Sequence, residues 1–342
     1  MRHFLYILSA ALLAAAVTGC SGQKKYTIVR GYAQGGSYHI IYSPYKSDGT
    51  RIGASEDSVA SVIGKTLRDV DFSISGYNRE SILSRTNRGE DCQLDSIFIN
   101  IFEISKRIYE ETGGLFDISG SPLFDFWGFG FSSTGGIDSL MNEEVTSRKI
   151  DSLLEFTGMD LVRIENGRLV KSDPRVRLSF DAIAQGYTCD LIAMELDRFG
   201  IEDYLVEVGS EIVCKGLNYN GDKWRIGLEK PIEGNYVAGS SIQDTLLLTD
   251  CGITTSGNYR KFYIMNGKKY GHSIDPVSGY PAQQDLLSAT VITNRKKYPG
   301  AYSDAYATYC MVIGADRALA FIRSKDDLSG YLITDSAVME VL

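Results

Sequence analysis

The sequence predicts an α+β fold in which mixed or antiparallel strands are flanked by helices. Segments with a helical repeat and segments with a strand repeat do not alternate regularly along the chain, as they would in a doubly wound sheet. Short, turn-bounded segments rich in β-branched and aromatic residues dominate the second half. The chain has 342 residues, 44% of them hydrophobic, so it can bury the core of one large domain or of two closely packed lobes.

The first half begins with strands and continues with helices. Alternation of apolar and polar residues over 26–30 and 38–42 predicts two strands joined by a turn at Gly35-Gly36. Apolar residues recur at helical spacing over residues 59–70 and again over residues 94–108, where the pattern ends near Gly113-Gly114. Two amphipathic helices are therefore expected before residue 115.

The middle of the chain is mixed and the remainder is rich in strands. The same patterns predict further helices over residues 143–156, 183–199, 303–313 and 315–322. They predict strands near residues 161–164, 177–180, 204–208, 212–215, 224–229, 245–248, 259–265, 288–293 and 331–334.

The N-terminus has the features of a bacterial signal peptide. A positive charge at Arg2, an apolar run over residues 4–17 and small residues before Cys20 predict a signal peptide over residues 1–19. The apolar run is shorter than the roughly 20 residues that a membrane-spanning helix needs. We expect lipidation at Cys20, a short tether over residues 20–25 and a folded domain over residues 26–342. The protein would then be exported and anchored by its lipid to a bacterial membrane, facing the periplasm. The alternative is an ordinary cleaved signal peptide with an incidental cysteine.

Charge and cysteine content exclude some classes of function. The chain has 43 acidic and 35 basic residues, a net charge of -8 that would repel a phosphate backbone, so nucleic acid is not an expected partner. After Cys20, the cysteines form no CxxC pair or Cys/His cluster, so a zinc site is not expected. Their number is odd and their neighbours are apolar, which predicts buried thiols, at least one of them unpaired: Cys92, Cys189, Cys214, Cys251 and Cys310.

Several clusters combine turn-forming glycine with polar or acidic side chains, as ligand-binding loops do. In chain order they are Y-N-R-E-S-I-L-S-R-T-N (77–87), T-G-G-L-F-D (112–117) with W-G-F-G (127–130), D-A-I-A-Q-G-Y (181–187), S-G-N-Y-R (256–260), H-S-I-D-P (272–276) with G-Y-P (279–281), and D-A-Y-A-T (304–308).

In this order the clusters resemble the ApbE family over nearly the whole mature chain. The resemblance implies a single catalytic unit with the activity of an FAD:protein FMN transferase, which uses Mg²⁺ beside the pyrophosphate of FAD. It also implies that a threonine hydroxyl of another protein accepts FMN, that AMP leaves, and that the acceptor belongs to a membrane redox complex.

The metal has partial support from spacing alone. Asp304 and Thr308 are four residues apart, so one face of a helix would present a carboxylate and a hydroxyl together. Such hard oxygen ligands suit Mg²⁺, although the same pair can be a solvated face or a local hydrogen bond. The resemblance raises the expectation of a metal and adds the backbone carbonyl of Ala182 as a third ligand. Some relatives have another acid where this chain has Ala301.

The resemblance also implies which residues contact FAD. They are Gln34, Tyr77, Leu115, Phe116, Asp117, Ser179, Gln185 and Ile274. The ring of Tyr77 suits packing against a flavin or an adenine. Two of these residues depart from the family pattern, which has Met at the position of Gln34 and Lys or Glu at the position of Gln185. The side chains of Leu115 and Phe116 fit a structural core equally well.

His272 is the one histidine that lies in a cluster. An imidazole titrates near neutral pH, so it could orient a phosphate or accept the proton of the hydroxyl, with Asp275 and Arg260 in support. A structural role in a turn is the alternative.

Two other functions use the same residues. With water in place of threonine, the enzyme would be an FAD pyrophosphatase that releases FMN and AMP. A flavin-binding lipoprotein would hold FAD intact, but binding alone does not require the acid and hydroxyl pair.

Overall fold

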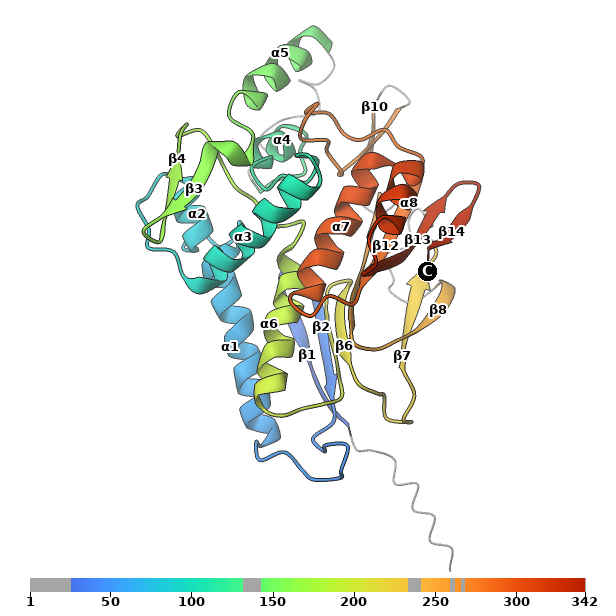
Figure 1. Cartoon of the computed structure of the whole chain (residues 1–342). Helices are drawn as coiled ribbons and strands as arrows, with labels where there is room; N and C mark the ends of the chain where they lie inside the picture. The colour runs from blue at the N-terminus through green and yellow to red at the C-terminus, as the bar shows by residue number, and fades with distance from the viewer. Residues whose placement is uncertain (1–25, 132–142, 233–240, 259–261, 266–267, 342) are drawn as a thin grey trace, which may run out of the picture.

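The computed structural model describes residues 26–131, 143–232, 241–258, 262–265 and 268–341, and one large sheet runs through it (Figure 1). In spatial order, the strands of this sheet are β1 (Thr27–Ala33), β2 (Gly36–Tyr42), β5 (Tyr204–Val208), β6 (Glu211–Lys215), β9 (Cys251–Gly257), β12 (Leu286–Thr293), β13 (Leu328–Thr334) and β14 (Val338–Val341). Every neighbouring pair is antiparallel. The antiparallel sheet confirms the predicted α+β class.

Helices cover one face of this sheet. α1 (Glu56–Ile74), α6 (Ala184–Arg198) and α7 (Pro299–Ile313) pack there, and α8 (Ala315–Arg323) follows α7 against β13. The buried side chains between α1, α6 and the sheet form one apolar cluster, which includes Ile40, Val206 and Val213. The sheet thus supports α6 and α7 side by side.

A hairpin covers part of the opposite face. It consists of β7 (Trp224–Glu229) and β8 (Ile242–Leu248), and its Trp224 and Ile226 pack on Leu205 and Ile253 of the sheet. Because β-strand side chains alternate between faces, neighbouring residues of one strand belong to different clusters. Val213 of β6 faces the helices, whereas Cys214 faces the hairpin.

The remaining helices lie at the other end of the molecule (Figure 1). They are α2 (Ile82–Asn87), α3 (Ser96–Glu111), α4 (Ser121–Phe126) and α5 (Glu143–Leu154), accompanied by the hairpin β3 (Val162–Glu165) and β4 (Arg168–Lys171) and by the hairpin β10 (Phe262–Met265) and β11 (Lys268–Gly271). Their apolar residues join those of α7 and β12 in the largest core cluster. This helical part therefore packs closely on the sheet part.

Two sequence-based predictions are wrong in detail. The segment 177–180 is not a strand, because the side chain of Asn87 bonds both backbone groups of Leu178 (Nδ2 to O, 2.8 Å; N to Oδ1, 2.9 Å). Its one sheet-like contact is an isolated bridge between Arg177 and Gly120. The first turn lies at Gln34-Gly35 instead of Gly35-Gly36, since Ala33 pairs with Gly36.

The five described cysteines are buried, as expected, and all five are free. Cys214 and Cys251 lie opposite each other on β6 and β9, with their Sγ atoms 3.7 Å apart. Among the residues that the structure describes, no helix has the length and apolar character to cross a membrane.

Candidate functional site

The site begins where two helix N-termini meet. Gly186 of α6 and Gly300 of α7 face each other so closely that a Cβ on Gly186 would lie 2.2 Å from the Gly300 carbonyl oxygen. Only glycine allows the two backbones to approach in this way. The first turns of α6 and α7 therefore lie against each other on the sheet.

Each helix satisfies backbone donors of the other. The N–H of Gly186 donates to Oδ2 of Asp304 on α7 (3.0 Å). In return, the N–H groups of Gly300 and Ala301 donate to the two carboxylate oxygens of Asp190 on α6 (2.8 Å each). First-turn N–H groups have no partner within their own helix, so these carboxylates cap the two helices reciprocally.

Carboxylates are concentrated around this contact. Burial raises the pKa of Asp304 well above its usual range, and the charges of Glu211, Asp190 and Asp181 add to the effect, while the bond from Gly186 opposes it. Burial likewise raises the pKa of Glu211 to about 7. Among the described residues, no lysine or arginine pairs with Asp304. A cation bound beside these carboxyl groups would favour their charged forms and lower their pKa values.

The donor set at this point fits a magnesium ion completed by other oxygens. Thr308 lies one turn after Asp304, and its Oγ1 is 3.5 Å from Oγ of Ser256 on β9. Ala182 lies in the turn that leads into α6, four residues before Gly186. No three acidic, histidine or cysteine side chains among the described residues are grouped to hold a metal. Asp304, the Thr308 hydroxyl and the Ala182 carbonyl would thus need phosphate or water oxygens to complete the shell, as Mg²⁺ commonly does.

Gln34 and Gln185 lie beside this group. Gln34 and Gly35 both have positive φ (51° and 77°), which defines a two-residue hairpin turn of type I′. The Nε2 of Gln34 donates to Oγ1 of Thr188 on α6 (2.7 Å), and the backbone carbonyl of Gln34 accepts from Nε2 of Gln185 (3.3 Å). The Oε1 of Gln34 is buried without a partner in the described part of the chain. A ligand that donates a hydrogen bond here would satisfy it.

A second group of predicted residues lies around the turn after α3. Asp117 accepts from the N–H and the hydroxyl of Ser119 (2.7 Å each), and burial raises its pKa to about 6. Ser179 joins this turn through its N–H, which donates to the carbonyl of Ile118 (2.7 Å). Two residues later, Asp181 begins the turn before α6, so the chain leads directly from this group to the first.

The predicted apolar contacts are mainly core residues. Phe116 and Ile274 are buried in the largest cluster, and Leu115 packs on it. The structure therefore supports the structural interpretation of the Leu115 and Phe116 side chains.

Tyr77 is the predicted contact that is most open to a ligand. Its side chain is 75% exposed and makes an edge contact with Phe131 (centroids 4.8 Å apart). Burial of part of the phenol and the nearby charge of Asp181 raise its pKa. The ring thus stands at the edge of the turn that precedes α6.

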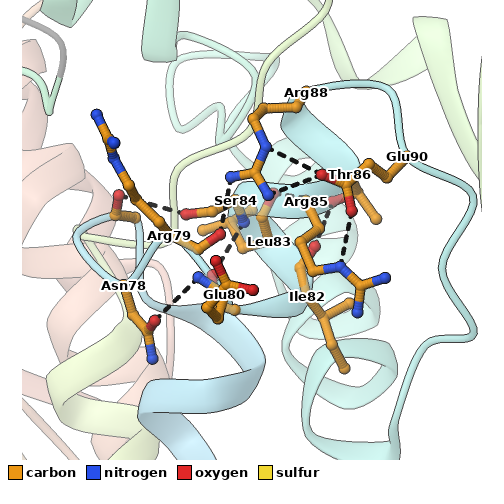
Figure 2. Close-up of polar contacts among 12 residues, drawn as sticks. Asn78, Arg79, Glu80, Ile82, Leu83, Ser84, Arg85, Thr86, Arg88 and Glu90 are labelled. Atoms are coloured by element: carbon orange, nitrogen blue, oxygen red, sulfur yellow. Dashed lines mark hydrogen bonds and ion pairs between the residues drawn. The ribbon is translucent and has the colours of Figure 1, made fainter.

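The rest of the Tyr77–Asn87 cluster forms a local network of hydrogen bonds and ion pairs. Figure 2 shows Arg85 and Arg88 converging on Glu90, and Arg88 also donates to the carbonyl of Arg79 (2.7 Å). With Asn87 bonded to Leu178, this motif fixes α2 against the segment that contains Ser179.

His272 ends a row of stacked rings. Trp127 stacks on Tyr270 (5.8 Å between centroids), Tyr270 on Tyr263 (5.5 Å) and Tyr263 on Phe129 (5.5 Å), and the edge contact of Phe129 with His272 is 6.3 Å. The half-buried imidazole is therefore held beside the W-G-F-G loop.

Asp275 shapes the loop that follows His272. Its carboxylate accepts from the N–H groups of Val277 (2.8 Å) and Ser278 (3.2 Å), and its backbone bonds those of Gly279 and Tyr280. The Nε1 of Trp127 donates to the carbonyl of Gly279 (2.8 Å), which ties the loop to α4. Arg260 and Cys20 lie outside the described residues.

Sequence reasoning missed Asp190 and Glu211. Asp190 lies four residues after Gly186, a spacing that puts both on one face of a helix. Nothing else in the sequence distinguishes Asp190 from an ordinary helical acid. Glu211 follows the turn at Gly209-Ser210 between two predicted strands, and burial of that position could not be read from the sequence.

Comparisons with known proteins identify the family of this chain. The ApbE family model matches residues 35–332. An FAD:protein FMN transferase of Vibrio cholerae is 32% identical over 323 residues, covering 94% of this chain and 90% of that protein. One of Haemophilus influenzae is 28% identical over 341 residues, covering 97% and 93%. The solved flavin transferase ApbE of Vibrio cholerae superposes with a TM-score of 0.77 at 30% identity, covering 92% of this chain and 96% of that one. The chain belongs to the ApbE family.

Proposed function

We propose that this ApbE-family enzyme transfers FMN from FAD to a threonine hydroxyl of an acceptor protein, with Mg²⁺ as cofactor and AMP as leaving group. The observation that carries the proposal is the buried Asp304 at the joined N-termini of α6 and α7, with Thr308 on the next turn. Mg²⁺ held there by Asp304, Thr308 and the carbonyl of Ala182 would neutralise the pyrophosphate.

The joined first turns of α6 and α7 also suit catalysis, because Gly186 and Gly300 allow them to lie against each other. Reciprocal capping by Asp190 and Asp304 fixes these first turns before a ligand arrives, so the site is preorganised. Positioning and electrostatics supply most of the catalysis in phosphoryl transfer.

The other residues then have separate tasks. Gln34, with its unpartnered Oε1, and the exposed ring of Tyr77 would bind FAD on either side of the turn before α6. Asp275 holds the loop after His272, so the imidazole can orient a phosphate or accept the threonine proton.

The activity is tested by incubating the purified protein with FAD and Mg²⁺, with and without a candidate acceptor. Flavin bound covalently to the acceptor is the expected result. Free FMN and AMP alone would instead indicate a pyrophosphatase, and intact FAD would indicate a flavin-binding protein.

The metal assignment is tested by Asp304→Asn. The amide retains an oxygen to accept from Gly186 but removes the anionic ligand, so Mg²⁺ affinity should fall and transfer should slow by about a hundredfold or more. Thr308→Val should give a milder loss that added Mg²⁺ partly restores. Asp316→Asn, on the exposed first turn of α8, is the matched control and should transfer FMN normally. A native rate for Asp304→Asn across a Mg²⁺ titration would contradict the assignment.

We also propose that the enzyme is exported and anchored by a lipid on Cys20, facing the periplasm, and that its acceptor is a subunit of a membrane redox complex. The sequence around Cys20 supports the anchor, and membership of the ApbE family supports the acceptor. Acylation predicts that labelled fatty acid is incorporated into the native protein and not into Cys20→Ser.

A further inference from the structure

The described chain begins at Tyr26, beside a group of exposed apolar side chains. The hydroxyl of Tyr26 donates to the carbonyl of Leu217 (2.7 Å), and its ring contacts Tyr219 (6.5 Å between centroids) and Trp224 (5.9 Å). Tyr219 is 51% exposed and Leu217 38%, and Ile28, two residues along the chain on the same face as Tyr26, is 60% exposed. We call Ile28, Leu217 and Tyr219 the Tyr26 patch.

Chain length limits how far this patch can lie from a lipid on Cys20. Five residues separate Cys20 from Tyr26, and a fully extended chain of this length reaches at most about 20 Å. A lipid inserted in a bilayer would therefore keep this end of the domain near the membrane surface.

The composition of the patch suits that surface. Tyrosine combines an apolar ring with a polar tip and is favoured at membrane interfaces. The loop that carries Leu217 and Tyr219 has one exposed charge of each sign, Asp222 and Lys223, and the neighbouring Lys215 pairs with Asp197. The exposed charges of the loop therefore add no net repulsion of anionic lipids, even though the whole chain is acidic.

The catalytic site lies at the opposite end of α6 from the patch. The loop after α6 carries Asp203, whose carboxylate accepts from the N–H of Leu217 (2.8 Å), so the C-terminal end of α6 and the patch share one end of the molecule. Gly186, at the site, is in the first turn of α6, about 18 Å away along the helix. Figure 1 shows the start of β1 and the end of α6 at the same end, with α4 and α5 at the other.

We infer that the Tyr26 patch rests on the lipid bilayer and holds the catalytic site roughly 20 Å above it, facing away from the membrane. This placement relies on the proposed lipid anchor. It implies that the acceptor presents its threonine on a part that projects about this far from the bilayer.

The test measures proximity to lipid at two positions. A single cysteine is introduced at Asn220→Cys, beside the patch, or at Lys149→Cys, on α5; both positions are exposed. The described native cysteines are buried, so a maleimide fluorophore should label the new thiol. The lipidated full-length protein is placed in vesicles of phosphatidylethanolamine and phosphatidylglycerol, with or without a nitroxide-labelled headgroup lipid. Quenching should be several-fold stronger at position 220, and equal quenching would overturn the inference.

A patch variant separates the side chains from the tether. In the Asn220→Cys background, Leu217→Asp with Tyr219→Asp should reduce quenching toward the value at position 149, while FMN transfer to a soluble acceptor remains normal and shows that the variant is folded. Unchanged quenching would overturn the role of the patch. Failure of the native protein to float with vesicles would overturn the anchor and this placement together, whereas loss of FMN transfer alone would concern the catalytic proposal.

Discussion

His272 is held in place from two directions, which makes a test of its catalytic role informative. The ring row from Trp127 to Phe129 fixes one side of the imidazole, and the loop held by Asp275 follows directly. His272→Ala should therefore lower the rate of FMN transfer much more than FAD affinity, if the imidazole acts in the transition state.

The readouts are single-turnover transfer and equilibrium FAD binding. His272→Gln is a useful companion because it retains a hydrogen-bonding group without the basic nitrogen. Equal losses in rate and affinity, or no loss in either, would assign His272 to structure alone.

Lys171 links α2 to the segment before Ser179, and its titration makes the stability of the protein depend on pH. Its Nζ donates to the carbonyls of Thr86 (2.8 Å) and Val176 (2.9 Å), and burial, with a smaller effect of Arg177, lowers its pKa to about 8. Between about pH 8 and 10.5, the native chain has released a proton that the unfolded chain retains, so the free energy of unfolding rises with pH. Relative to Lys171→Met, the wild type should gain on the order of 1 kcal/mol across this window, because solvent screens a half-buried group. Urea unfolding of both proteins at several pH values measures the gain, and a constant difference would contradict it.

At the scale of elements, the contact of α6 with α7 determines the geometry of the site. In Gly186→Ala, the new Cβ would lie 2.2 Å from the Gly300 oxygen and 2.7 Å from Cβ of Asp304, so the helices must separate. We expect a loss of about 2 kcal/mol in the free energy of unfolding and weaker Mg²⁺ binding.

Gly64→Ala is the matched control for this prediction. Gly64 is also within a helix, but the nearest atom to its added Cβ is the flexible tip of Arg68 at 3.4 Å. This substitution should stabilise by up to about 1 kcal/mol and leave Mg²⁺ binding unchanged. Similar effects of both substitutions on urea unfolding would contradict the role of close helix contact at Gly186.

Periodicity predicted most of the helices and strands but missed the short helices α2 and α4 and several strands. Strands β5 and β7 have the predicted bounds, and α3, α6 and α8 are close to them. Four strands were not predicted: β4, β9, β11 and β14. β9 reads C-G-I-T-T-S-G, whose two glycines hide the strand pattern, although Gly252 is required by the close approach of Pro299 (2.3 Å from an added Cβ).

The residues of the candidate site that the family resemblance supplied could be predicted from the sequence. Residues whose charge and hydrogen bonds depend on burial could not. Asp304 and Thr308 are on one helix at the predicted spacing. The sequence could not indicate that Asp190 caps α7 or that Glu211 is buried near Asp304, since both depend on how α6, α7 and the sheet pack. The prediction of a strand over residues 177–180 failed for a related reason, because the side chain of Asn87 from α2 takes the place of a neighbouring strand.

At the scale of the whole molecule, the three apolar clusters share elements of one sheet. Val213 and Cys214 are adjacent on β6 but belong to the clusters on its two faces. Ala289 and Ile292 of β12 likewise belong to the largest cluster and to the hairpin cluster. No cluster can lose its strands without exposing another, so the clusters should unfold together.

The buried cysteines allow this to be measured, because every cluster contains at least one thiol. Cys310 is in the largest cluster, Cys189 is in the cluster under α1 and α6, and Cys214 and Cys251 are under the β7–β8 hairpin. The native protein should resist N-ethylmaleimide, and labelling of these thiols, followed by peptide mass spectrometry across a urea gradient, should show one common midpoint. FAD with Mg²⁺ should move that midpoint to higher urea for all of them, since a ligand bound at the α6–α7 contact stabilises the native state as a whole. Earlier labelling of Cys214 and Cys251 alone would instead show that the β7–β8 hairpin opens independently of the helices, and the sheet would then not couple its two faces.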